Sequence, residues 1–228
     1  MNESIGNFDE YAKTYDQLLS GALGVFGNEN SYYAFRKVEY LSLLLQKKRP
    51  QRILDFGCGV GSIVSHLFNF FPEAEIWGTD PSVSSMEIAQ RENPRMKCVD
   101  ELSIPSNYFD VVVVSNVLHH VQEAHRQSLL QRISKSLADR GKIVIFEHNR
   151  LNPITRRIVD RCEFDEGVEL LSERSCGELL VKTGCFEGIE SGYFLFVPPF
   201  FKKFRNIERH LSRVPIGAQF WQTARRVG

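Results

Sequence analysis

The spacing of apolar side chains along this chain switches between two periods, and the switches predict the order of its elements. Short runs rich in β-branched and aromatic residues predict strands. These runs lie at 53–54, 74–80, 96–99, 109–114, 142–147, 186–196 and 219–224. Apolar residues three and four apart predict helices that begin near residues 8, 31, 63, 83, 129, 153, 175 and 200. Strands that alternate with helices are typical of the α/β class.

The first strand runs directly into a glycine-rich turn. Asp55 follows Ile53 and Leu54, and Gly57, Gly59 and Gly61 then stand at alternate positions before a helical pattern. Glycine lets the backbone turn sharply and approach a ligand without a Cβ. The pattern differs from the dinucleotide fingerprint G-x-G-x-x-G. A carboxylate at the turn would repel a pyrophosphate and would suit a cationic amine, so a nicotinamide oxidoreductase is the disfavoured alternative.

The second strand ends at Asp80, nineteen residues after Gly61. An acidic residue at this position can accept both ribose hydroxyls of a nucleoside. Asp80 can also cap the next helix, with Pro81 at its first position. We leave both roles open at this point.

Asp55 to Gly61, Asp80 and the stretch Ser115 to His120 resemble the motifs of class I S-adenosylmethionine (AdoMet)-dependent methyltransferases of the small-molecule group. The resemblance runs from about residue 8 to the C-terminus. It implies a Rossmann-like, doubly wound, seven-stranded sheet with helices on both faces. This sheet would be mostly parallel with one antiparallel C-terminal strand, in a single domain over 1–228. The implied cofactor is AdoMet, with S-adenosylhomocysteine as product.

The resemblance also implies which residues bind the cofactor. They are Asp55, Gly57, Cys58, Gly59, Gly61, Asp80, Pro81, Asp100, Glu101, Ser115, Asn116 and Tyr15. Either Asp100 or Glu101 would meet the adenine. Tyr15, with Tyr11 beside the substrate, would belong to N-terminal lid helices over 8–49. The alternative is that both tyrosines only pack.

Three residues at the ends of later strands are candidates for catalysis, in the order His120, His119 and Glu147. A general base is needed only if the acceptor is a hydroxyl or a cationic amine. Residues 148–171 interrupt the alternation and are expected to cover the acceptor, where Arg156 and Arg157 would recognise a phosphate or carboxylate. A structural histidine, a solvated Glu147 and a solvated arginine face are the alternatives.

The amino-acid composition narrows the classes of binding partner that we expect. Lys+Arg and Asp+Glu number 28 each in 228 residues, so the balance gives no electrostatic reason to expect a nucleic-acid partner. There is no long apolar run, basic leader or C-x-x-C spacing, and the five cysteines are scattered. We therefore expect a cytoplasmic protein without a metal site. The basic segment 200–213 either packs on the sheet or touches a membrane surface, and the oligomeric state is left open.

Together these features predict transfer of a methyl group from AdoMet to a small-molecule, sugar or lipid-linked acceptor by in-line displacement. The alternative from another class is a non-catalytic module that binds AdoMet or a protein partner. The acceptor and the atom that is methylated do not follow from the sequence.

Overall fold

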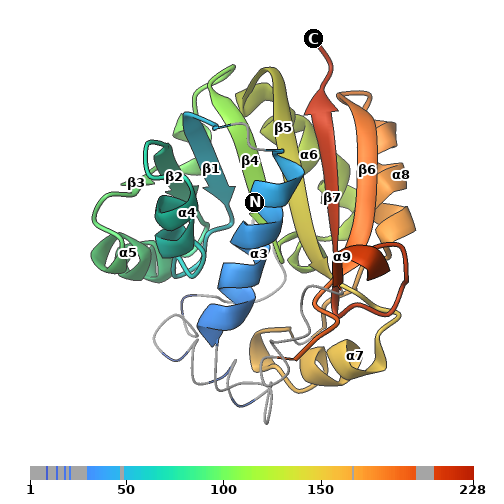
Figure 1. Ribbon diagram of the computed structural model, residues 1–228. Coiled ribbons are helices and arrows are strands. Elements are labelled where there is room, and N and C mark those ends of the chain that lie inside the picture. Colours follow the sequence, from blue (N-terminus) through green and yellow to red (C-terminus); the bar gives the residue numbers. More distant parts are fainter. Residues whose placement is uncertain are drawn as a thin grey trace.

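The computed structural model describes residues 9, 14, 18, 21, 30–46, 49–165, 167–198 and 208–228. Within them, seven strands form one sheet in the order β3-β2-β1-β4-β5-β7-β6 (Figure 1). Strand β7 runs opposite to the other six and is antiparallel to both of its neighbours, β5 and β6. The strands are β1 Arg52–Phe56, β2 Glu75–Thr79, β3 Lys97–Cys98, β4 Phe109–Ser115, β5 Leu137–His148, β6 Phe186–Phe194 and β7 Gln219–Arg226. The predicted fold class is confirmed.

The central strands are apolar on both faces because helices cover both sides of the sheet. Ile53 and Val113 point into one core cluster, whereas Leu54 and Val112 point into the other. In register, Leu54 of β1 lies beside Val112 of β4. The period-2 alternation of a strand thus divides one valine run between two cores.

Helices α3, α4 and α5 contribute to the first cluster, and α6 and α8 contribute to the second. Figure 1 shows α3 in front of the sheet and α6 and α8 behind it. The helices are α3 Asn30–Leu44, α4 Val64–Phe70, α5 Val83–Glu92, α6 Glu123–Ser136, α7 Pro153–Val159, α8 Glu173–Thr183 and α9 Glu208–Leu211. Short 3-10 turns are η2 Glu101–Ser103, η3 Leu118–His120 and η4 Glu163–Asp165. In the described part of the chain, no helix has the length and hydropathy needed to cross a bilayer.

Several element boundaries differ from those expected. Strand β5 starts at Leu137 rather than 142, because Leu137 already pairs with Phe109 before a register shift. Helix α8 starts at Glu173 rather than 175, because Ser172 is its N-cap and forms a capping box with Ser175. Of the helix expected over 200–213, the described residues include only α9. Most of the helix expected over 8–19 lies outside the described residues.

Helix α3 is a packed part of the molecule. Val38 and Leu41 are buried in the first core cluster. Arg36 forms a buried ion pair with Glu208 of α9, whose other carboxylate oxygen accepts a hydrogen bond from the Val197 amide at 2.8 Å. This pair joins distant parts of the chain and holds α3 in place. The next residue, Lys37, is thereby directed toward the strand ends.

Candidate functional site

The glycine turn after β1 uses its three glycines for different reasons. Gly57, Gly59 and Gly61 all have positive φ, at 74°, 52° and 80°. A Cβ on Gly57 would lie 2.5 Å from Cγ2 of Val117, and one on Gly61 would lie 2.8 Å from Nδ2 of Asn93. A Cβ on Gly59 would meet nothing within 4 Å. Two glycines therefore permit close packing, and the third faces open space that a ligand can use.

Asp80 closes this turn from the end of β2. Its Oδ2 accepts a hydrogen bond from the Gly59 amide at 2.8 Å, and its Oδ1 accepts one from the Ser82 amide at 2.9 Å. Burial raises the pKa of Asp80 above its ordinary value. The N-cap of α5 is Ser82, which accepts a hydrogen bond from the Ser85 amide. The capping role considered for Asp80 is therefore wrong, and Pro81 is an exposed residue that precedes the cap.

Asp55 lies under the turn with its charge uncompensated by hydrogen bonds. Only 1% of the residue is exposed, and neither carboxylate oxygen has a hydrogen-bond partner among the residues that the structure describes. Burial raises the pKa of Asp55 to about 7, against the opposing effect of Lys37. Burying an ionised carboxylate without a partner costs free energy unless a cation pairs with it.

Lys37 is a site residue that the sequence analysis missed. It is 7% exposed, and its Nζ donates a hydrogen bond to Oγ of Ser115 at 2.8 Å. Burial lowers the pKa of Lys37 to about 8, and the charges of Glu147 and Asp55 oppose this effect. The available signal was a lysine within the apolar stripe that Ala34, Val38 and Leu41 form along α3.

The residues expected near the adenine lie at η2. Asp100 caps this turn by accepting a hydrogen bond from the Leu102 amide at 2.8 Å. Glu101 forms an exposed ion pair with Arg132 at 2.9 Å. Cys58, also expected at the cofactor, is buried with its Sγ 3.5 Å from Sδ of Met86. Asp100 is therefore the freer of the two carboxylates to face a ligand.

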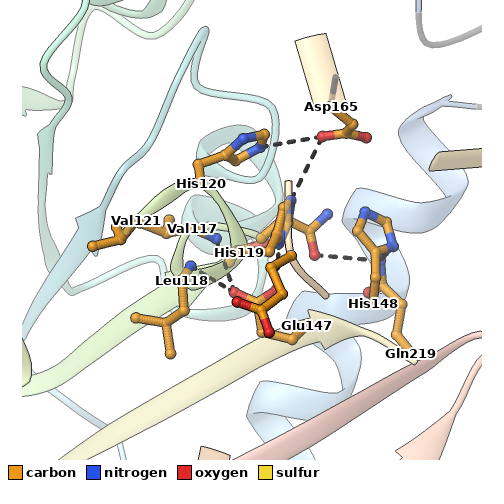
Figure 2. Close-up of polar contacts among 12 residues, drawn as sticks. Val117, Leu118, His119, His120, Val121, Glu147, His148, Asp165 and Gln219 are labelled. Carbon is orange, nitrogen blue, oxygen red and sulfur yellow. Dashed lines mark hydrogen bonds and ion pairs between the residues drawn. The ribbon is translucent and has the colours of Figure 1, made fainter. Parts of the chain in front are cut away.

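A second polar cluster surrounds η3, where β4 ends (Figure 2). Glu147 of β5 is fully buried, and its Oε1 accepts hydrogen bonds from the amides of Val117 and Leu118 at 3.1 and 2.7 Å. Its Oε2 lies 2.5 Å from Nδ1 of His119. Burial alone would raise the pKa of Glu147, but the charge and hydrogen bond of His119 lower it below its ordinary value.

The other end of the η3 turn is held by Arg126 of α6. Nε of this buried arginine donates hydrogen bonds to the carbonyl oxygens of Leu118 and Val121 at 3.0 and 2.9 Å. Donors and acceptors of the turn are thus both satisfied by side chains. His119 and His120 consequently occupy fixed positions.

Asp165 of η4 completes the cluster from a distant part of the sequence. Its Oδ1 lies 3.2 Å from Nε2 of His120 and 3.6 Å from Nε2 of His119. Burial would lower the pKa of His119, but Glu147 and Asp165 raise it to about 9. Burial and the neighbouring His119 lower the pKa of His120, and burial lowers the pKa of His148 to about 3.

The segment 148–171 that carries Asp165 is attached to the residues before β7. Asn149 Nδ2 donates hydrogen bonds to the carbonyl oxygens of Pro215 and Gly217. Thr155 Oγ1 donates one to the carbonyl oxygen of Ala218 at 2.9 Å. These bonds place the segment beside the carboxyl end of β5, in agreement with its position in Figure 1.

Comparison with known proteins identifies the family. The family described as "Methyltransferase domain" matches residues 26–186. The chain belongs to this methyltransferase family. An uncharacterized methyltransferase from Bacillus cereus is 23% identical in an alignment of 223 positions that covers 95% of this chain and 94% of the relative.

Solved methyltransferases share the fold. A Thermotoga maritima protein described as a SAM-dependent methyltransferase and possible histamine N-methyltransferase superposes with a TM-score of 0.68, at 18% identity, over 96% of this chain and 97% of that one. Human N-acetylserotonin methyltransferase, solved in complex with SAM, gives a TM-score of 0.65 at 14% identity, over 96% of this chain and 57% of the human chain.

Within this methyltransferase, the predicted catalytic residues form one unit. His119 and His120 contact Asp165, and Glu147 contacts His119 but is itself held by two backbone amides. Glu147 is therefore suited to position His119 rather than to take a proton from an acceptor.

The remaining predicted residues lie elsewhere. Ser115 contacts Lys37, and Asn116 adopts a positive φ of 57° with its Oδ1 3.4 Å from Nε2 of Gln219. Arg156 and Arg157 are exposed on α7. Tyr11 and Tyr15 lie outside the described residues, so their roles stay predictions.

Proposed function

We propose that this methyltransferase uses AdoMet to methylate a small-molecule, sugar or lipid-linked acceptor by in-line displacement. The observation that carries the proposal is the pairing of an open glycine turn with two carboxylates at the ends of β1 and β2, of which Asp55 is buried and Asp80 is half-buried. Asp55 lacks a hydrogen-bonded partner in the described chain, and Gly59 faces open space. Both features fit a nucleoside that carries a cationic amino acid.

The residues fit the parts of AdoMet in a definite order. Asp80, which already bonds the Gly59 amide, would accept the ribose hydroxyls. Asp55 would compensate the ammonium group of the methionine part. Lys37, between Asp55 and Ser115, would meet its carboxylate. This arrangement places opposite charges of the ligand against opposite charges of the protein.

When bound, AdoMet supplies a sulfonium-activated methyl group. The protein then has to hold donor and acceptor in line and exclude water. Because His119, His120 and Asp165 meet where β4 ends, we place the acceptor, and the loss of its proton, beside this cluster. Glu147 fixes the orientation of His119.

The acceptor class is supported by two observations. The formal net charge is zero, so no basic surface excess favours a nucleic acid. The Thermotoga and human neighbours carry names that refer to small molecules, histamine and N-acetylserotonin. We therefore include a small-molecule acceptor for this chain in the proposal.

Isothermal titration calorimetry tests the cofactor assignment. We expect S-adenosylhomocysteine and AdoMet to bind and NADH not to bind. Replacing Asp80 by Asn should weaken the binding of S-adenosylhomocysteine about 100-fold, because hydrogen bonds to a charged group contribute about 1.5–3 kcal/mol each. The exposed Asp139→Asn variant, at the opposite edge of the sheet, is the control. Absence of heat with both sulfur compounds, with no effect of Asp80→Asn, would refute the proposal.

A further inference from the structure

The atoms that meet at η3 and η4 have the separations of metal ligands. His119, His120 and Asp165 each offer one ligand atom, a ring nitrogen or a carboxylate oxygen, and these three atoms lie within 4.8 Å of one another. The Asp165 oxygen is 3.2 Å from one nitrogen and 3.6 Å from the other. Ligands about 2.0–2.1 Å from a tetrahedral zinc ion lie about 3.3 Å apart. The cluster therefore needs little rearrangement to surround an ion.

Hydrogen bonding leaves this cluster incomplete. Asp165 is 7% exposed and His119 is fully buried. In the part of the chain that the structure describes, Oδ1 of Asp165 and Nε2 of His119 have ion-pair contacts but no hydrogen bond of good geometry: the Asp165 oxygen lies 3.6 Å from His119 Nε2 and 3.2 Å from His120 Nε2. Buried polar atoms without well-formed hydrogen bonds destabilise the free protein. A cation between them would satisfy both.

The surroundings of His119 match those of a metal-binding histidine. Such a histidine commonly donates its other ring N–H to a carboxylate, which fixes the tautomer and the ring orientation. Here Nδ1 of His119 lies 2.5 Å from Glu147, which is anchored by two backbone amides. Figure 2 shows the imidazole between Glu147 and Asp165, with one nitrogen toward each. The nitrogen left for a metal is the one directed toward Asp165.

We propose that His119, His120 and Asp165 bind a divalent transition-metal ion of the zinc class. Two imidazole nitrogens favour such an ion over Mg²⁺ or Ca²⁺, which prefer oxygen ligands. Three protein ligands leave a fourth position open, as in catalytic zinc sites. In the methyltransferase proposed above, an acceptor oxygen would occupy that position, and this role alone rests on the proposed function.

Metal binding can be measured without AdoMet, which separates the two proposals. Protein stripped with a chelator is titrated with Zn²⁺ in a calorimeter, and bound zinc is counted after gel filtration. We expect one zinc per chain in the wild type and in the Glu163→Gln control, whose exposed residue lies on the same η4 turn. Asp165→Asn should bind at least 100-fold more weakly, and Glu147→Gln about 10- to 100-fold more weakly.

Cobalt provides a readout that a merely structural role would not change. Wild-type protein loaded with Co²⁺ should show the visible absorption of a low-coordinate nitrogen and oxygen site, and Asp165→Asn should lose it. If circular dichroism shows that Asp165→Asn does not fold, His120→Gln replaces it in both measurements. Wild-type protein that binds zinc no better than the variant, or a sulfur-to-cobalt charge-transfer band from one of the cysteines, would overturn the proposal.

Discussion

Two buried carboxylates, Asp55 on β1 and Glu147 on β5, lie at the same edge of the sheet in opposite states. Glu147 has hydrogen bonds from Val117, Leu118 and His119, and its pKa is lowered. Asp55 has no hydrogen-bond partner in the described chain, and burial raises its pKa to about 7. The protein itself supplies the hydrogen-bond donors that Glu147 needs, whereas Asp55 is left for a ligand to pair with.

This difference suggests that Glu147 stabilises the structure and that Asp55 serves ligand binding. A buried charge with three donors stabilises the turn that it holds, whereas one without donors destabilises the free protein. Natural proteins tolerate such a cost where function requires it. The charges of both carboxylates attract Lys37. Substitutions on the two sides should therefore change stability in opposite directions.

The largest effect is expected at Glu147. Replacing it by Ala removes the acceptor for two backbone amides and leaves the buried His119 without its counterion. We expect a loss of about 3–5 kcal/mol in the free energy of unfolding, measured with urea. Glu187→Ala, at an exposed position of β6, is the control and should change little. A loss below about 1 kcal/mol would contradict the anchoring role of Glu147.

Alanine substitutions in the glycine turn should distinguish the glycine that is needed for packing from the one that leaves room for a ligand. Gly57→Ala combines a strained positive φ, costing about 1–2 kcal/mol, with a contact to Val117 that costs about 1–3 kcal/mol more. Gly59→Ala has the φ strain alone and should fold, with cofactor affinity reduced about tenfold in calorimetry. Equal stability of the two variants in thermal melts would contradict this division.

The substitution Asp55→Asn should stabilise the free protein and weaken the binding of the cofactor. The folded pKa of about 7 lies above the value of about 3.9 in an unfolded chain. The stability that protonated Asp55 contributes is therefore fully present below pH 4 and is lost as pH rises through 7. We expect the variant to be more stable than the wild type by about 1–3 kcal/mol at pH 8 and to lose this advantage at pH 4. Urea titrations across this range measure the difference, and a destabilised variant at pH 8 would refute it.

The smallest effect on stability is expected on α7. Arg156 and Arg157 are exposed, so replacing both by Ala should change the free energy of unfolding by less than about 0.5 kcal/mol. If they recognise an anionic group, KM for the acceptor should rise about tenfold while kcat and cofactor affinity stay constant. Unchanged acceptor kinetics would leave them as a solvated helix face.

The position of the glycine turn and its two carboxylates was predictable because these parts are local in sequence. Asp55 lies near the end of β1, the three glycines come after this strand, and Asp80 directly follows β2. The carboxyl ends of adjacent parallel strands meet at one edge of the sheet. The alternation of strands and helices indicated the α/β class, and the seven-stranded sheet followed from the resemblance to methyltransferases. The boundaries of β5 and α8 were missed because pairing to Phe109 and the Ser172 cap decide them.

The polar cluster around η3 was only partly predictable. His119, His120 and Glu147 stand at strand ends and could be selected, but their mutual contacts depend on how β4 and β5 are joined. Asp165 comes from an irregular segment after β5, and Lys37 comes from a helix before β1. Tertiary packing alone brings these two residues to the strand ends, and no local pattern specifies it.

The position of β7 has a consequence for how the molecule is made. The last strand in the chain lies between β5 and β6, so β6 has no neighbour in the sheet until residues 219–226 arrive. During synthesis, the sheet can close only after residues 219–226 have left the ribosome. A chain cut before residue 219 would leave β5 and β6 with unpaired edges, which are templates for aggregation.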